Sequence, residues 1–515
     1  MILLFVCLKH ALYIIKYVKI YRKTGDKMFK KKLRAEASGA ATENKMGTMP
    51  VNRLLISMAL PMVASMLVQA LYNIVDSLYV ARISDTPDEL TAISLAFAAQ
   101  NFMIAVAAGT GVGINALLSK SLGEKNFKMA DKIAANGVFL AICSYIVFFV
   151  LGLTCMETYM GWMTDDARVI GFGVDYLSIC FVLSFGLFGQ IVMERLMIST
   201  GKTYLAMMTQ GIGAIINIIL DPIFIFENGI GSIIQNPGFL NFGFGLGISG
   251  AAVATVIGQI VAFIVGIILD RKLNREIHLS FRGFRPDLKI IGRIYAIGIP
   301  SIIMASIGSV MNVLFNSILN GFSAIAAGST HTIGKLAQTS FGVYFKLQSF
   351  IFMPIFGLNN GIVPIVAYNY GAQKRKRLTS AVKLGIIYAV GYMALGLLAF
   401  QTLPEFLLSF FDMSDAASLA IAVPCLRIIS ISFVFAGFCI IVGSVFQALG
   451  KSIFSMFVSI ARQLVVLVPV AYLLSRLGDV SLVWWAFPVA EIMSVIVTTV
   501  FFIIIYRNII SHIPE

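Results

Sequence analysis

The stretch GTGVGINALLSKSLGEK at residues 109–125 keeps the glycine spacing of GLNNGIVPIVAYNYGAQK at residues 357–374. Gly109, Gly113 and Gly123 match Gly357, Gly361 and Gly371, with spacings of 4 and 10 residues in both stretches. Two further pairs of short matches occur in the same order: Leu60-Pro61 with Ile299-Pro300, and Gly201-Lys202-Thr203 with Gly450-Lys451-Ser452. Several signals in one order indicate that the chain is an internal duplication of two halves.

The composition is that of a membrane protein. Of the 515 residues, 58% are hydrophobic and only 12% are charged, whereas soluble domains carry about 25% charged residues. Because a transmembrane helix needs about 20 apolar residues, the sequence predicts twelve such helices. Their approximate limits are residues 54–80, 91–115, 132–156, 169–193, 203–226, 249–270, 293–319, 331–357, 379–403, 418–443, 452–474 and 482–506.

Each half then has six helices, an even number, so both halves enter the membrane in the same orientation. We therefore predict an all-α polytopic membrane protein with twelve transmembrane helices in two six-helix lobes. A pseudo-two-fold axis along the membrane normal relates the lobes. The domains we expect are a basic N-terminal extension (residues 1–50), an N-lobe with helices one to six (51–275) and a C-lobe with helices seven to twelve (276–515).

Lysine and arginine gather in the loops on one side of the predicted membrane, for example within residues 120–128, 271–293 and 374–377. Because positively charged loops stay in the cytoplasm, we expect both termini to be cytoplasmic. This asymmetry accounts for the net charge of +14, so nucleic acid is not an expected partner. The first 50 residues are either an interfacial amphipathic helix or an over-extended start, with Met28, Met46 or Met49 as the true one.

The sequence contains no complete catalytic motif. Gly201-Lys202-Thr203 resembles the end of a P-loop, but the glycine required five residues earlier is replaced by Leu196. The six cysteines show no CxxC pattern, and the four histidines form no HExxH motif. We therefore expect neither an enzyme nor a cofactor.

Two aspartates interrupt the apolar runs, Asp76 in residues 54–81 and Asp221 in residues 203–226. A carboxylate at the centre of a membrane helix costs roughly 2.5–3.5 kcal/mol and usually faces a cavity or an ion path. Other polar side chains share the helix faces of the two acids or lie on the sixth helix: Ser65, Gln69, Asn73, Asn217 and Thr255.

Three interpretations of the two acids are open. Carboxylate, amide and hydroxyl oxygens suit a small hard cation, whereas two close carboxylates would also make a proton site. Alternatively, each acid pairs with a buried base, for which the second half offers these residues: Lys335, Lys346, Arg427 and Arg462. Pro61, near the start of the first helix, allows that helix to bend.

The second lobe differs from the first because its first helix carries no acid. Asn312 and Asn316 lie there on a face similar to that of Asp76, so we expect the cation or proton site in the first lobe only. Arg462 and Glu491 are candidates for a buried pair, either structural or facing a substrate, and Lys346 could join that network. We name four residues as candidates for lining the second lobe's cavity: Asn312, Asn316, Lys346 and Arg462.

These features resemble the multidrug and toxic compound extrusion (MATE) family, most closely its bacterial branch related to DinF and MepA. The resemblance spans roughly residues 50–510 and is carried by five stretches. They are LPMVASMLVQALYNIVDSLYV (60–80), GTGVGINALLSKSLGEKN (109–126), NIILDP (217–222), GISGAAVATVIGQ (247–259) and MPIFGLNNGIVPIVAYNYGA (353–372).

The resemblance implies alternating access and antiport of organic cations or drugs against Na⁺ or H⁺. It implies that either ion binds in the first lobe at Asp76, Asn217, Asp221 and Thr255, and that Tyr176 on the fourth helix joins that network. Asn73 and Gln69, which share the helix face of Asp76, are expected to support it. It also implies that the first helix bends at Pro61. We expect a monomer in the lipid bilayer of the bacterial cytoplasmic membrane.

Two other functions are weighed against this one. A lipid-linked precursor flippase of the same superfamily would need a cavity rich in Arg and Lys, yet few basic residues lie within the predicted spans. A membrane receptor or scaffold that transports nothing would leave the two acids and the duplicated lobes unexplained.

Overall fold

The computed structural model describes residues 44–514, apart from residues 81–82, 84–87, 228, 230–241, 282, 326–331, 412 and 414 and the side chains of Asn73, Ser77 and Leu90. The chain divides into two units, Met1–Thr48 and Met49–Glu515. Within the first unit the structure describes the short helix α2 (Lys45–Thr48). Most of the predicted N-terminal extension therefore lies outside the described residues.

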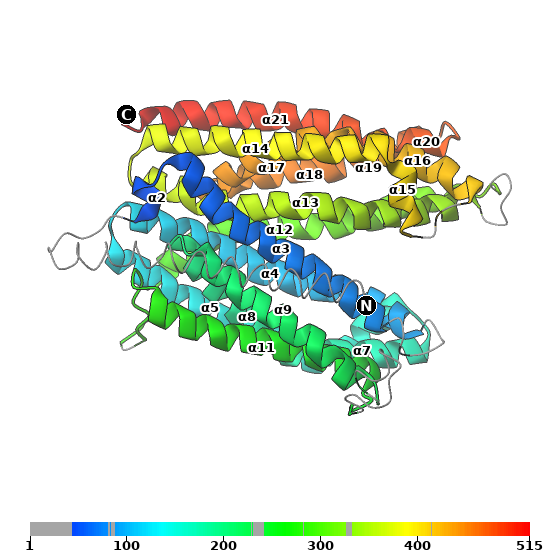
Figure 1. Ribbon diagram of the computed structural model, residues 1–515, viewed down its shortest axis with the longest axis horizontal. Helices are drawn as coiled ribbons and strands as arrows, with labels where there is room; N and C mark the ends of the chain where they lie inside the picture. Colours follow the sequence, from blue (N-terminus) through cyan, green and yellow to red (C-terminus); the bar gives the residue numbers. More distant parts are fainter. Residues whose placement is uncertain are drawn as a thin grey trace. The chain divides into compact units, whose positions relative to one another are not determined.

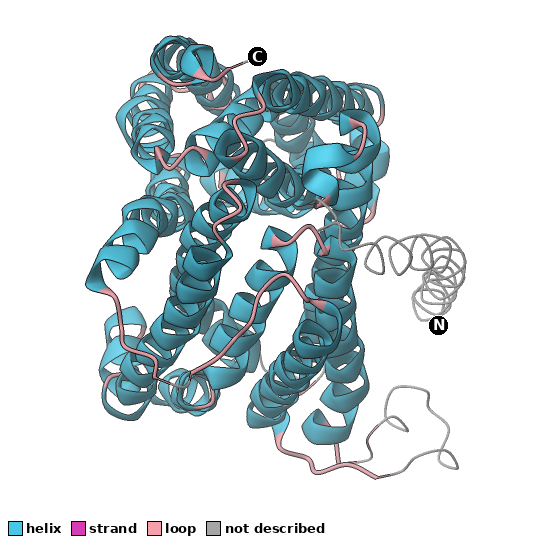
Figure 2. Cartoon of the chain, turned by 90° about the vertical axis from the view of Figure 1, so that its left-hand side faces the viewer, coloured by secondary structure: helices cyan, strands magenta, loops and turns pink. Residues whose placement is uncertain are grey.

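The described part of Met49–Glu515 is built from helices, seen from the side in Figure 1 and end-on in Figure 2. The first half contains α3 (Val51–Val80), α4 (Asp88–Gly123), α5 (Phe127–Thr154), α6 (Met156–Met163), α7 (Ala167–Val182), α8 (Phe185–Ser199), α9 (Thr203–Ile225) and α11 (Gly247–Leu273). The second half contains α12 (Leu288–Asn320), α13 (Ile333–Gly371), α14 (Arg375–Thr402), α15 (Pro404–Ser409), α16 (Ala416–Ser430), α17 (Ser432–Ala448), α18 (Ser452–Ile460), the π-helix η1 (Ala461–Leu467), α19 (Val468–Ser475), α20 (Val480–Val483), α21 (Ala486–Asn508) and the 3₁₀-helix η2 (Ile510–His512).

The prediction of twelve spans agrees with these helices. Ten described segments are long and apolar enough to cross a membrane, and two bent helix pairs bring the number to twelve when each pair is one span. The pairs are α7 with α8, bent by 47°, and α16 with α17, bent by 42°. Both breaks fall in the fourth span of their half. At the second break, Ser430 and Ser432 donate hydrogen bonds to carbonyls of the preceding turn, an arrangement that bends helices.

The duplicated glycines lie inside α4 and α13, both of which extend further than predicted. A Cβ atom at Gly109 would lie 2.5 Å from Ile302 of α12, and one at Gly113 would lie 2.2 Å from the Ile294 carbonyl oxygen. In the second half, Gly357 and Gly361 meet the backbone of α3 at 2.6 Å and 2.9 Å. Each repeat therefore presses its glycines against the first helix of the other half.

The third glycine of each repeat joins α4 directly to α13. A Cβ atom at Gly123 would lie 2.1 Å from the Tyr368 carbonyl oxygen, and one at Gly371 would lie 2.1 Å from the Lys120 carbonyl oxygen. We call Gly109, Gly113, Gly123, Gly357, Gly361 and Gly371 the glycine seam. Since glycine has no Cβ, the backbones of the two lobes can touch along this seam.

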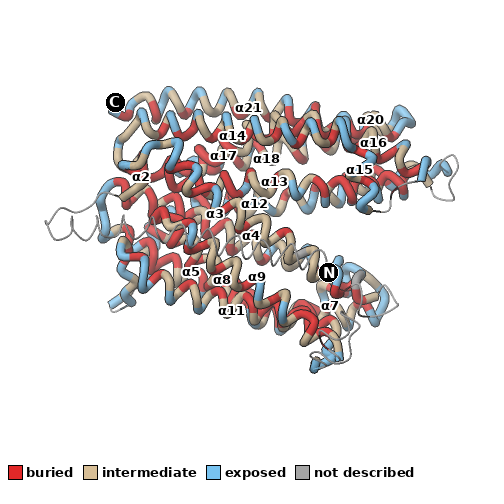
Figure 3. Tube along the Cα trace, in the orientation of Figure 1, coloured by how far each residue is buried: buried red, intermediate tan, exposed pale blue. Residues whose placement is uncertain are grey.

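The glycine seam lies toward the end of the molecule that carries the C-terminus and the basic loops. From this end the helices of the two halves diverge, as α3 and α4 separate from α12 and α13 in Figure 1. Figure 3 shows mainly buried residues where these helices meet and more intermediate and exposed ones where they separate. Val313 on the diverging part of α12, for example, is 71% exposed.

Candidate functional site

Asp221, Asn217 and Thr255 form the centre of a polar site between α9 and α11. Asn217 Nδ2 donates to Asp221 Oδ1 at 3.0 Å and lies 3.3 Å from Thr255 Oγ1. Asp221 is fully buried, and Asn217 and Thr255 are buried as well. The two helices can approach closely because Gly258 has no Cβ atom. A Cβ atom there would lie 2.8 Å from the Gly213 carbonyl oxygen. Glycines one turn from Asn217 and from Thr255 thus bring these two side chains together.

Asp76 reaches the same site from α3. It lies within electrostatic range of Asp221, and the hydroxyl of Tyr72, one turn before it, is within range of both acids. Asp76 Oδ1 is buried without a hydrogen-bond partner. The structure therefore brings together the two acids that the sequence singled out, although they are far apart along the chain.

Tyr176, on α7, closes the site from a third direction. It is buried, forms a side-chain hydrogen bond with Gln100 of α4 and lies within electrostatic range of Asp76. Cys180, one turn further on, is also within range of Asp76. Sequence reasoning missed Gln100 and Cys180, because their residue types are common in membrane helices and only the packing of α4 against α7 links them to the acids.

Three oxygen atoms at this site accept no hydrogen bond although all three are buried: Asp76 Oδ1, Asn217 Oδ1 and Asp221 Oδ2. Buried polar atoms are nearly always satisfied in folded proteins. Carboxylate and amide oxygens are acceptors, so a proton or a small cation would satisfy them. This set of atoms fits the predicted ion or proton site, and also Na⁺, whose hard character favours oxygen ligands.

The other predicted first-lobe residues lie further along α3. Gln69 Oε1 accepts a hydrogen bond from Gln210 Nε2 at 3.1 Å, and the Ser65 hydroxyl donates a hydrogen bond to Gln210 Oε1. These residues form a second polar contact between α3 and α9, about two helical turns from Asp76. Pro61 lies within α3, which is one continuous helix. The Asn73 side chain is outside the described residues.

The second lobe contains the predicted pair of Arg462 and Glu491, whose Nη1 and Oε1 atoms are 2.5 Å apart. Arg462 lies on the π-helix η1, and π-helical turns occur often at functional sites. Glu491 Oε2 is buried without a partner, and Tyr344 of α13 is within electrostatic range of both charges.

The remaining second-lobe candidates lie elsewhere. Lys346 Nζ is 5.8 Å from the centre of the Phe411 ring. Asn316 Nδ2 donates to the Asn312 carbonyl oxygen at 3.0 Å within α12. Both asparagines are half-buried, and no acid occurs within α12.

Breaking the pair in the second lobe should destabilise the protein. We expect Glu491→Gln to lower the free energy of unfolding by about 3 kcal/mol, because it leaves the half-buried Arg462 without a counter-charge. The double variant Arg462→Met with Glu491→Met should recover most of that loss. Thermal unfolding of the purified variants in detergent measures both effects. Equal stability of Glu491→Gln and the parent protein would mean that the pair contributes nothing.

A charged contact between the lobes was not predicted. Arg195 of α8 donates from Nη1 to Asn360 Oδ1 of α13 at 2.9 Å, and its stem passes over Gly111 of α4. Beside it, Gln190 Nε2 donates to Glu194 Oε1 at 2.9 Å. The sequence could have suggested this contact, since both residues lie in or near the duplicated motifs. Asn360 lies within the second glycine repeat, and Arg195 lies close to Gly201-Lys202-Thr203.

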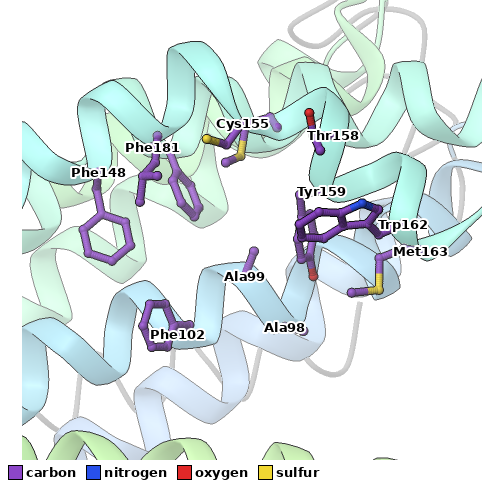
Figure 4. Close-up of a pocket in the computed structure, with 12 residues that line it drawn as sticks. Ala98, Ala99, Phe102, Phe148, Cys155, Thr158, Tyr159, Trp162, Met163 and Phe181 are labelled. Carbon is purple, nitrogen blue, oxygen red and sulfur yellow. The ribbon is translucent and has the colours of Figure 1, made fainter.

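A groove of about 480 Å³ lies on the first lobe between α4, α5, α6 and α7. Figure 4 shows phenylalanine side chains at one end of it and Tyr159, Trp162 and Met163 at the other. Phe102 is 51% exposed and Trp162 is 80% exposed. None of the predicted site residues lines this groove, so it is separate from the acid pair.

Comparison with known proteins agrees with the duplication. A family model described as MatE matches residues 61–223 and 309–473. The matched segments start 248 residues apart, as do Gly109 and Gly357. The chain is 24% identical over 433 residues to a Staphylococcus saprophyticus protein named multidrug export protein MepA, covering 84% of this chain and 89% of that protein. A Staphylococcus aureus protein of the same name is also 24% identical, with coverages of 86% and 91%.

Solved structures resemble the fold. One described as the outward-facing conformation of a multidrug resistance MATE family transporter superposes with a TM-score of 0.81 at 22% identity, covering 91% of this chain and 99% of that chain. A MATE structure in complex with MaL6 gives a TM-score of 0.80 at 21% identity, also covering 91% and 99%. The predicted fold class of twelve helices in two lobes is thereby confirmed.

Proposed function

This chain belongs to the MatE family, and on that premise we propose that it is a secondary active exporter of organic cations or drugs. The export is coupled to entry of Na⁺ or H⁺ at the site formed by Asp76, Asn217, Asp221 and Thr255. The observation that carries the proposal is the set of three buried, unpartnered acceptor oxygens around the acid pair. The names of the relatives, multidrug export protein, support the choice of substrate.

The orientation follows from the basic loops. Positively charged loops favour the cytoplasm, so the end with the glycine seam faces the cytoplasm of a bacterium and both termini lie there. In the described conformation the seam and the Arg195–Asn360 contact hold the lobes together at this end. The diverging ends then face the outside, which is an outward-facing arrangement in the bilayer. A monomer suffices for this mechanism.

The chemistry begins at the acid pair. Two carboxylates within electrostatic range of each other and out of water repel, so the site gains free energy when a proton or a cation neutralises them. The bound ion also satisfies Asn217 Oδ1 and Asp221 Oδ2. Thr255 supplies one more oxygen ligand, and Tyr176 and Tyr72 border Asp76.

Neutralising Asp76 changes the interactions of α3, the helix that carries it. Pro61 leaves one hydrogen bond of α3 unmade, so the helix bends there at low cost. Bending moves Gln69 and Ser65 relative to α9. In the outward-facing state this movement weakens the binding of substrate, which is released to the outside. Exchange results because ion and substrate favour different states of one protein.

The test uses the purified protein in liposomes. A Na⁺ gradient or a pH gradient, imposed alone, should drive accumulation of a fluorescent organic cation such as ethidium against its own gradient. The ion that drives accumulation is the coupling ion. Accumulation with neither gradient would refute the proposal. Movement of a lipid-linked pyrophosphate, but not of the organic cation, would favour a flippase, and no transport at all would favour a receptor or scaffold.

A further inference from the structure

The pair of Arg462 and Glu491 has no role in the proposed coupling mechanism, although it places two charges inside membrane spans. Glu491 is the only acidic residue in the described helices that form the spans of the second lobe. Its Oε1 atom pairs with Arg462 Nη1, whereas its Oε2 atom is buried without a hydrogen-bond partner. Since charges within membrane spans usually mark a substrate or ion pathway, the pair is a candidate binding site.

The pair lies at the place in the second half that the ion site occupies in the first. The offset of 249 residues between the two Gly-Lys matches carries Asn217 to Val466, which lies within η1. Asn217 and Thr255 connect the fifth span to the sixth. Arg462 and Glu491 likewise connect the eleventh span to the twelfth. The duplicated fold thus has a polar site in each lobe, and the site in the second lobe already contains a cation.

Space remains beside the pair inside the lobe. Tyr344 of α13 and Cys439 of α17 lie within electrostatic range of both charges, so helices surround the pair. The Arg462 side chain is nevertheless 27% exposed, and this exposed part faces the interior of the lobe. On α12, Gly308 has no side chain at a point where a Cβ atom would lie 3.8 Å from Gln463 Oε1 of η1. Because α12 borders the divergence between the halves in Figure 1, this glycine leaves a route from there to the pair.

The balance of charge within the pair decides which ligand fits there. An organic cation bound to Glu491 in place of Arg462 would leave the guanidinium unpaired. An anion bound to Arg462 would leave the Glu491 carboxylate unpaired in the same way. Removing one partner of an ion pair out of water is strongly unfavourable. A molecule with one positive and one negative group replaces both partners at once, so every charge stays paired.

We infer that the second lobe binds zwitterionic substrates by opening the Arg462–Glu491 pair. The cationic nitrogen of the substrate donates hydrogen bonds to Glu491, and the unpartnered Oε2 atom accepts the first of them. The carboxylate of the substrate accepts hydrogen bonds from the Arg462 guanidinium, whose planar fork matches a carboxylate. The inference rests on the proposed export function and adds to it a class of substrate, drugs that carry both a cationic nitrogen and a carboxylate.

The experiment compares two dyes that differ in a single charge. A rhodamine with a free carboxylate is a zwitterion, and its methyl ester is a cation of nearly the same shape. Equilibrium dialysis against the full chain in lipid nanodiscs, with empty nanodiscs subtracted, measures the affinity for each dye. The parent protein should bind the free acid roughly tenfold more tightly than the ester or better, the effect of one hydrogen bond to a charged group. Equal affinity of the parent protein for the two dyes would overturn the inference.

The double variant Arg462→Met with Glu491→Met should lose the preference for the free acid, and Arg462→Gln with Glu491→Gln gives the same readout if the methionine variant does not fold. The control, Asp88→Asn with Arg168→Gln, removes an ion pair of the first lobe whose atoms are 3.3 Å apart and should keep the preference. A preference that persists without the Arg462–Glu491 pair, or that disappears in the control as well, would overturn the inference.

Binding of the two dyes is measured without any gradient, whereas the proposed function is tested by gradient-driven accumulation of ethidium, which carries no carboxylate. Accumulation of ethidium by a parent protein that binds both rhodamines equally would overturn the inference alone. A preference for the free acid without driven accumulation of ethidium would overturn the proposed export alone.

Discussion

Replacing either acid by its amide should abolish coupled export. In Asp76→Asn or Asp221→Asn, export of ethidium from loaded cells should fall roughly tenfold or more, because coupling free energies of about 1–3 kcal/mol are lost with the charge. The amide has nearly the same shape as the carboxylate, so packing around Asn217 and Thr255 is preserved. Asparagine also donates hydrogen bonds, which places a permanent donor where an ion would arrive and depart.

Asp175→Asn is the matched control. Asp175 lies one residue before Tyr176 on α7, but its side chain is exposed, so its removal should leave export at the parental rate. Thermal unfolding of the three variants separates loss of coupling from loss of folded protein. If Asp221→Asn exports at the parental rate while remaining folded, the acid pair is not the coupling site.

Adding one methyl group to the glycine seam should separate the lobes at the end with the basic loops. In Gly123→Ala the new Cβ would lie 2.1 Å from the Tyr368 carbonyl oxygen, a backbone atom that cannot rotate away. Overpacking of this kind costs about 1–3 kcal/mol, which corresponds to a roughly 5- to 150-fold shift away from the outward-facing state. Gly371→Ala should act in the same way, because it meets the Lys120 carbonyl oxygen at the same distance.

Spin labels at exposed Lys125 and Gln373, after replacement of the native cysteines, report the separation of α4 and α13 at this end. The distance between the labels should lengthen in Gly123→Ala. Gly342→Ala is the control, because a Cβ atom at that position of α13 meets nothing within 4 Å. Unchanged distances in both seam variants would mean that the seam does not hold the lobes closed.

Much of the fold could be predicted from the sequence because its causes are local or repeated. Apolar length predicts each span, and the offset of 248 residues between Gly109 and Gly357 predicts the two lobes. The sequence did not predict that these glycines bind the lobes to each other, since a spacing does not say which backbone lies opposite. The bend between α7 and α8 was also missed, because neither a proline nor a glycine occurs at Leu183 and Ser184.

The residues of the candidate site also fall into two groups, those that the sequence predicted and those that only the packing of helices reveals. Asp76 and Asp221 could be found because burying a carboxylate in a membrane is costly, and Asn217 because it lies one turn from Asp221. Tyr176 came only from the family resemblance, and Gln100 was missed because its connection to Tyr176 depends on packing between α4 and α7. The Arg462–Glu491 pair was predicted from charge alone, whereas its position on a π-helix was not.

The central claim is that substrate movement and ion movement are linked through Asp76 and Asp221. Because coupling is reciprocal, an ethidium gradient imposed across liposomes should itself drive Na⁺ or H⁺ in the opposite direction. A fluorescent indicator for each ion inside the liposomes measures this flux directly. We expect an ion flux with the parent protein and none with Asp221→Asn. Dissipation of the ethidium gradient by the parent protein without movement of either ion would contradict the account.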